Sequence, residues 1–225
     1  MSRRPSQDAP LPADMLEALV ADLEPVTPLR SREGLFLTAL LLAWLLLLVV
    51  LGLAPGHDLA AGVLEPMFIL RSGTLLLLGG AAAAAAVATA RPGIGDGAGG
   101  VRHGWLAALA MAGLFPLAAL ASSIADPAAA RAAILRPSAI ECLGVSLTLA
   151  LGVAGVLVFW LRRGAPVSLE RAGWVVGIAA GALGGFAFSL RCPYTEVAYI
   201  GTWFTLVVAI AAVAGRLAVP RLIRW

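Results

Sequence analysis

The chain has 225 residues, of which 60% are hydrophobic and only 13% are charged, with a formal net charge of +3. A soluble domain carries about 25% charged residues, so this composition excludes an ordinary soluble protein. The apolar residues form continuous runs of about 20 residues, which are typical of membrane-spanning helices and not of the short alternating strands of a barrel. We therefore expect an all-α integral membrane bundle, in which the arginines mark the ends of spans and do not indicate nucleic-acid binding.

Residues 1–34 precede the first apolar run and form the only sizeable segment outside the expected membrane domain. Pro12 suits the first turn of a helix and Pro25 ends that helix, and an extended connector then leads to Arg30. Between the two prolines, apolar residues recur at helical spacing. This stripe consists of Leu16, Leu19, Val20 and Leu23.

The polar face of this short helix decides what it could bind. Amphipathic helices that lie on lipid usually carry Lys and Arg on the polar face, whereas Asp14, Glu17, Asp22 and Glu24 make this face acidic. We therefore favour docking of the helix in the groove of a basic partner protein. A helix that lies on the membrane and a helix that caps the bundle are the alternatives.

Six apolar runs follow, and each is long enough to cross a hydrocarbon core of about 30 Å. They cover residues 35–54, 67–90, 104–124, 140–161, 172–190 and 199–218. The chain thus divides into a cytoplasmic segment, 1–34, with one amphipathic helix, and a six-helix transmembrane domain, 35–225.

The arginines predict how this domain is oriented. With an even number of spans both termini lie on one side, and twelve arginines lie on that side against four on the other. The four are Arg71, Arg131, Arg136 and Arg191. This positive-inside bias predicts a multi-pass protein of the bacterial inner membrane with cytoplasmic termini. The two cysteines then face the periplasm, where disulfides can persist.

Span 172–190 carries glycines four residues apart, at Gly173, Gly177, Gly181 and Gly185. Overlapping G-x-x-x-G motifs of this kind let a partner helix approach closely. If the helix continues, Cys192 falls on the same face, so we expect it to point at a packing seam with span 140–161. A homodimer face is the alternative use of this glycine stripe.

Cys142 and Cys192 are the only cysteines in the chain. They flank two apolar runs of nearly equal length, joined by the loop 162–166. Because a helix rises about 1.5 Å per residue, both should lie at the same height at the far end of a helical hairpin. Three interpretations stay open: a structural disulfide, a reactive dithiol that senses oxidants or thiophilic metals, and two unconnected buried cysteines.

Two further expectations concern the chemistry of these thiols. Arg191, next to Cys192, should lower the pKa of that thiol and raise its reactivity. A metal ion would need ligands besides two thiolates, but the outer-face candidates have no diagnostic spacing. These candidates are Glu141, Glu196, Glu65, Asp58 and His57.

We expect no catalysis and no resident cofactor, only a heavy-metal ion bound transiently as a signal. His57 and His103 lie on opposite sides of the membrane and cannot act together. The spans carry no acidic residue near the middle, which argues against a proton-coupled transporter, and the chain has no C-x-x-C motif typical of thiol oxidoreductases. A small transporter or channel and a membrane thiol oxidoreductase remain the alternative functions.

Several short stretches, taken with the six spans and the paired cysteines, resemble a bacterial anti-sigma family. They are Leu19 to Arg30, Arg162-Arg163-Gly164-Ala165-Pro166, Leu190-Arg191-Cys192-Pro193 and the ending Pro220 to Trp225. The family is NrsF, the negative regulators of sigma factor F, and the resemblance covers nearly the whole chain. One departure is that His commonly precedes the second cysteine in this family, whereas Arg191 stands here, which removes a metal ligand and favours direct oxidation.

The resemblance implies an anti-sigma factor that holds an extracytoplasmic-function sigma factor at the inner membrane. Cys142 and Cys192 would detect heavy-metal or oxidative stress and trigger release, so transcription would respond to stress without direct contact between this chain and nucleic acid. The hairpin of spans 140–161 and 172–190 would be the element that shifts. Together with the amphipathic stripe, the resemblance gives the expected sigma-contacting residues: Leu16, Leu19, Val20, Asp22, Leu23, Pro25, Val26, Pro28, Leu29 and Arg30.

Overall fold

The computed structural model describes residues 31–52, 65–90, 98–164, 166 and 168–223, together with residue 17. These residues form helices and no strand, as the sequence predicts. In chain order the helices are α2 (Ser31–Gly52), α4 (Pro66–Thr89), α5 (Ala98–Ala125), α6 (Pro127–Ile134), α7 (Ser138–Arg162), α8 (Leu169–Ser189) and α9 (Val197–Ile223). The expected sigma-contacting residues between 16 and 30 lie outside the described part of the chain, so their helix stays a prediction.

Five of these helices are long and apolar enough to cross a membrane: α2, within Arg32–Leu51, and the whole of α4, α7, α8 and α9. Helix α5 runs over 28 residues, but its described apolar stretch, Gly113–Ala125, is shorter than a span. The membrane bundle is therefore supported, while the sixth span stays a prediction.

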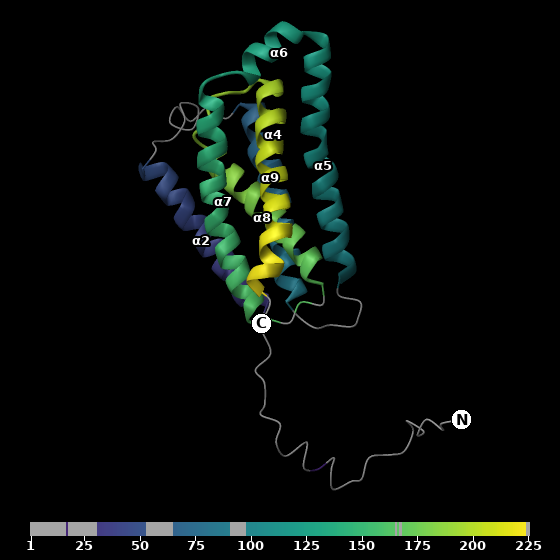
Figure 1. The fold of residues 1–225 in the computed structure, drawn as a ribbon. Helices are drawn as coiled ribbons and strands as arrows, with labels where there is room; N and C mark the ends of the chain where they lie inside the picture. The colour runs from purple at the N-terminus through teal and green to yellow at the C-terminus, as the bar shows by residue number, and fades with distance from the viewer. Residues whose placement is uncertain are drawn as a thin grey trace, which may run out of the picture.

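Successive long helices run in alternating directions, so several chain segments meet at each end of the bundle (Figure 1). The beginnings of α4, α7 and α9 and the end of α8 lie at the end that carries α6, which we call the α6 end. The end of α9 lies at the opposite end. At that opposite end, the Arg162 side chain of α7 donates a hydrogen bond of 3.0 Å to the Leu222 carbonyl of α9.

Helix α6 lies between the expected spans 104–124 and 140–161, where no helix was predicted. Asp126 precedes it and accepts a hydrogen bond of 3.0 Å from the Ala129 amide, while Pro127 occupies the first turn. An Asp cap followed by Pro is a favourable helix start. The Trp203 indole of α9 donates to the Ile134 carbonyl at 3.0 Å, so α6 is fastened to the beginning of α9.

The glycine stripe of α8 packs against α9 and not against α7. A Cβ atom at Gly177 would lie 2.3 Å from the Ala211 carbonyl oxygen, and one at Gly215 would lie 2.5 Å from the Gly173 carbonyl oxygen. The two backbones therefore touch along this α8–α9 seam. The expectation that the stripe faces span 140–161 is wrong, and so is the homodimer interpretation, because α9 already covers the stripe.

Helix α7 approaches α8 through a different glycine. A Cβ atom at Gly184 would lie 2.6 Å from the Ser146 carbonyl oxygen of α7. Residues four apart turn by about 400°, so the stripe drifts only slowly around the helix, and Gly184 lies on another face. The G-x-x-x-G spacing thus correctly predicts close packing, but it does not identify which neighbour packs there.

Candidate functional site

Cys142 and Cys192 lie in one buried cluster at the α6 end. Cys142 is in the second turn of α7 and is 0% exposed, and Cys192 is in the connection between α8 and α9 and is 4% exposed. The aromatic residues Phe188, Tyr199 and Phe204 belong to the same cluster. Both thiols are free. The chain therefore brings the two cysteines together at one end of the bundle, as their spacing predicts.

Two buried hydroxyl groups accompany Cys142. The side chains of Tyr199 and Ser146 lie beside its thiol, and both residues are 0% exposed. Among the described residues, neither hydroxyl makes a hydrogen bond of standard geometry. Buried polar groups are costly when unpaired, so the surroundings of the Cys142 thiol include two polar groups that gain from any new partner.

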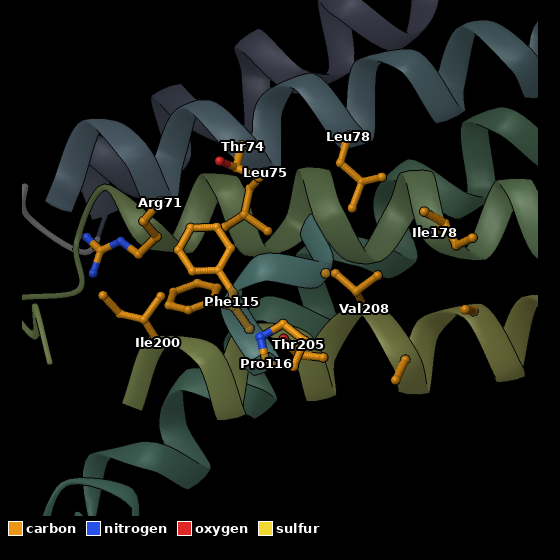
Figure 2. A pocket seen from close by; sticks show the side chains of 14 residues that line it. Arg71, Thr74, Leu75, Leu78, Phe115, Pro116, Ile178, Ile200, Thr205 and Val208 are labelled. Carbon is orange, nitrogen blue, oxygen red and sulfur yellow. The ribbon is translucent and has the colours of Figure 1, made fainter. Parts of the chain in front are cut away.

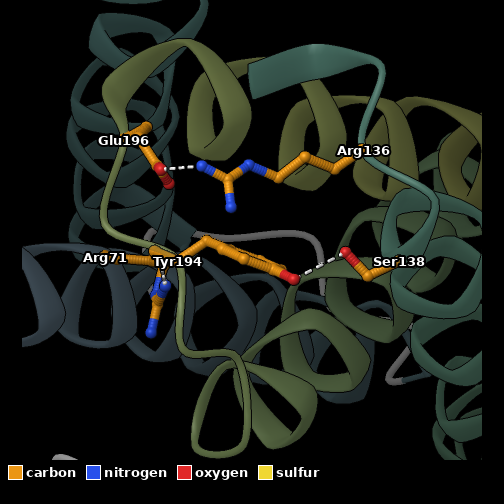
Figure 3. A network of polar contacts seen from close by, with 5 residues as sticks. All are labelled: Arg71, Arg136, Ser138, Tyr194 and Glu196. Carbon is orange, nitrogen blue, oxygen red and sulfur yellow. Dashed lines mark hydrogen bonds and ion pairs between the residues drawn. The ribbon is translucent and has the colours of Figure 1, made fainter. Parts of the chain in front are cut away.

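Arg71 of α4 holds the segment that carries Cys192. Its side chain is 1% exposed, and its guanidinium donates hydrogen bonds to three main-chain carbonyls. They belong to Tyr194 at 2.6 Å, Ser189 at 2.9 Å and Cys192 at 3.2 Å. Figure 3 shows the Arg71 side chain next to Tyr194. We call residues 190–196 the Cys192 link.

The sequence predicts no role for Arg71 beyond its place among the four outer arginines. The signal was nevertheless present, because Arg71 lies five residues after the first residue of an apolar span. A charged side chain inside a span almost always faces the bundle interior and pairs with other groups there, often main-chain carbonyls. Which carbonyls it meets could not be predicted, because they lie more than 100 residues further along the chain.

The electrostatics of Cys192 differ from the expectation. Burial raises the pKa of the Cys192 thiol above its ordinary value, and the nearby Arg71 guanidinium acts in the opposite direction without cancelling that effect. The prediction that Arg191 makes this thiol reactive is therefore wrong. Arg191 instead forms an ion pair of 3.7 Å with Glu141, which links the residues next to the two cysteines.

The other side of the Cys192 link is fastened to the beginning of α7 (Figure 3). Arg136 forms an ion pair with Glu196, and its guanidinium lies 4.6 Å from the centre of the Tyr194 ring. The Ser138 hydroxyl donates to the Tyr194 hydroxyl at 3.0 Å. The link is thus held between α4 on one side and the connection from α6 to α7 on the other.

The proposed metal ligands are not gathered around the thiols. In the described part of the chain, no group of three or more His, Cys, Asp or Glu side chains could hold a metal ion. Glu141 and Glu196 pair with arginines, and Glu65 is exposed. His57 and Asp58 lie outside the described residues.

A cavity of about 340 Å³ lies between α4, α5, α8 and α9. Figure 2 shows Arg71 and Ile200 at one end of it and Ile178 at the other. Most of its lining is apolar, with Thr74 and Thr205 as the only hydroxyl-bearing residues and no acidic residue among those that line it. Such a cavity does not favour a polar transport path through the bundle.

Comparison with known proteins decides the family. The chain matches the family model described as NrsF, negative regulator of sigma F, over residues 19–225. The chain belongs to the NrsF family. This match confirms the resemblance, and it includes both cysteines, Arg71 and the stretch from Leu19 to Arg30.

Two curated NrsF relatives are similar over most of their length. The anti-sigma-F factor NrsF of Caulobacter vibrioides is 31% identical over 215 residues, which are 94% of this chain and 98% of the relative. The probable anti-sigma-F factor NrsF of Azospira oryzae is 26% identical over 172 residues, which are 75% of this chain and 78% of the relative. No solved structure matches. The NrsF family is regulatory by description and not catalytic, in agreement with the expectation of a non-enzyme.

Proposed function

We propose that this NrsF-family chain is an anti-sigma factor of the bacterial inner membrane. Its N-terminal segment would hold an extracytoplasmic-function sigma factor in the cytoplasm and release it when Cys142 and Cys192 react with a heavy metal or an oxidant. The observation that carries this proposal is that the only two cysteines of the chain, 50 residues apart, lie in one buried cluster at one end of the bundle. The names of the relatives supply the sigma factor as partner.

The buried environment of the thiols supports a sensor that reacts slowly with its stimulus while at rest. Because burial raises the pKa of Cys192, this thiol is protonated at neutral pH and reacts slowly, since the thiolate is the nucleophile and the metal ligand. Oxidation would join two thiols in a disulfide, and the two electrons and two protons would pass to the oxidant. A soft metal ion would instead bind two thiolates and release two protons.

The orientation is supported by the state of the outer arginines. Arg71, one of the four on the cysteine side, is buried and bound to carbonyls. The number that can act at the membrane surface on that side is then three against twelve, which strengthens the positive-inside bias. The bundle would therefore place its α6 end, with Cys142 and Cys192, in the periplasm.

The α8–α9 seam is the element through which we propose that the signal moves. The Cys192 link joins these two helices directly, and their backbones touch along the seam. Helix α9 ends at Ile223 at the end of the bundle opposite the thiols. A displaced link would thus tilt α9 at the cytoplasmic face, where α2 begins.

Co-purification of the full chain from membranes tests the class of partner. We expect a sigma factor to be recovered with the wild-type chain and to be lost with Leu19→Asp or Leu23→Asp, because each places a charge on the apolar face of the predicted helix. Gln7→Ala lies before the predicted helix and should retain the sigma factor. Recovery that is unchanged in both Leu variants, or absence of any sigma factor, would contradict the proposal.

The sensing step has its own test. A reporter gene that depends on the recovered sigma factor should be induced by cadmium or hydrogen peroxide with the wild-type chain and should stay uninduced with the double variant Cys142→Ser, Cys192→Ser. Full induction with the double variant would remove the sensing role while leaving the anti-sigma role intact.

A further inference from the structure

The Cys192 link is shaped by one side chain from outside it. Arg71 donates to the carbonyls of Ser189, Cys192 and Tyr194, which span six consecutive positions around the thiol. A guanidinium presents its donors in a rigid planar fork. Three carbonyls can reach one such fork only if the chain curls around it, so the path of the link depends on Arg71.

The same side chain is anchored on the helix side. The Arg71 guanidinium carbon lies 5.6 Å from the ring centres of both Phe68 in α4 and Phe204 in α9. The hydroxyl of Ser72, the next residue of α4, lies 2.9 Å from the hydroxyl of Ser189. Two turns further along α4, a Cβ atom at Gly79 would lie 2.7 Å from the Leu183 side chain of α8. Helix α4 is therefore tightly coupled to the end of α8.

Burial makes the coupling obligatory. A buried charge is tolerated only while polar partners surround it. If the link moved away alone, Arg71 would lose the carbonyls of Cys192 and Tyr194, two of these three partners, so a displacement of the link acts on α4. The ion pair between Arg191 and Glu141 has no such effect, because the two side chains are 34% and 58% exposed and exposed pairs contribute little.

We propose that Arg71 is the positioning residue of the sensor: it holds the Cys192 link in the resting position and passes a displacement of that link to α4. The proposal that Arg71 holds the Cys192 link depends only on its hydrogen bonds to the three carbonyls. The consequence for sigma release rests on the function proposed above. Arg191→Met is the matched control, since it removes an equal charge next to the thiol from a side chain that is 34% exposed.

Hydrogen exchange of the full chain in lipid nanodiscs tests the hold on the link. Arg71→Met should speed amide exchange within residues 190–196 by at least about tenfold, because local opening no longer breaks charge-assisted bonds. Arg191→Met should change it less than about twofold. Arg71→Lys should also speed exchange, because an ammonium cannot reproduce the planar fork; it serves as the test if the Met variant does not accumulate. Unchanged exchange in the Arg71 variant, or equal acceleration by Arg191→Met, would overturn the proposal.

The passage of the signal is tested in the double variant Cys142→Ser, Cys192→Ser, which has no thiols. At equal membrane levels, adding Arg71→Met should raise the sigma-dependent reporter to its induced level and reduce co-purified sigma factor, whereas adding Arg191→Met should do neither. A reporter that stays repressed while the link exchanges fast would overturn the coupling through Arg71. Loss of cysteine dependence in the chain with Arg71 intact would count against the proposed function instead.

Discussion

Helices α2 and α8 show the opposite of the relation between hydrophobicity and burial that holds in soluble proteins. Of the five candidate spans, α2 is the most apolar and α8 the least, yet 22% of the α2 window and 83% of the α8 window are buried inside the protein. Many leucines of α2, such as Leu40 and Leu51, face outward, although Leu45 is buried, whereas glycine and alanine make up most of the buried residues of α8. In lipid, apolar side chains gain nothing by leaving the solvent, so close packing of small residues determines which helix is central.

The largest loss of stability is expected when a bulky side chain is added to the buried helix α8. Gly177→Leu in α8 should destabilise the bundle by about 4 kcal/mol, because even a Cβ atom would lie 2.3 Å from the Ala211 carbonyl oxygen. Gly155→Leu in α7 is the control, since nothing lies within 4 Å of a Cβ atom there. Thermal unfolding in detergent measures both, and equal melting temperatures would refute the close seam.

Removing a large side chain should destabilise the protein much more in α8 than in α2. Leu183→Ala in α8 should cost about 3 kcal/mol by leaving a cavity, since Leu183 is 2% exposed. Leu51→Ala in α2 should change stability by less than about 0.5 kcal/mol, since Leu51 is 74% exposed. Chemical unfolding of the two variants compares them, and a similar loss in both would show that α2 is packed as α8 is.

The contact between α2 and the rest of the bundle gives a smaller effect. A Cβ atom at Gly34 would lie 2.6 Å from the Trp160 ring of α7, and that ring is 2% exposed. Gly34→Val should therefore cost about 1–2 kcal/mol and loosen α2 alone. Hydrogen exchange should rise in residues 31–52 and stay unchanged in 169–189; a rise in both would mean that α2 supports the centre.

The smallest effect concerns pH at the α6 end. Since burial raises the pKa of Cys192 above 9.0 in the folded protein, the folded state holds this proton more tightly than the unfolded state. The corresponding stability is fully present below pH 9.0 and is lost as pH rises through the raised pKa. The melting temperature of the wild-type chain should approach that of Cys192→Ser as the pH rises above 9.0, and a constant difference would contradict the shift.

The sequence predicts well what depends on local pattern. The equal lengths of the two apolar runs correctly bring Cys142 and Cys192 to one end, and the glycine spacing correctly predicts a close seam. The partner of that seam was wrong, because a motif on one helix carries no information about which neighbour meets it. Arg71 was missed for a related reason: its carbonyl partners are main-chain groups, which no residue type reveals. The short helix α6 was missed because eight residues give little periodicity, although Asp126 and Pro127 mark its start.

The backbone contact between α8 and α9 also limits how this chain can evolve. Positions such as Gly173 and Gly177 touch main-chain atoms of α9, and main chain cannot be exchanged for something smaller, so no second substitution can restore the space that a larger residue would take. The exposed leucines of α2 project from the bundle and should interchange freely with other apolar residues. Among NrsF relatives, α8 should therefore retain its small residues while α2 keeps its hydrophobicity and loses its particular sequence.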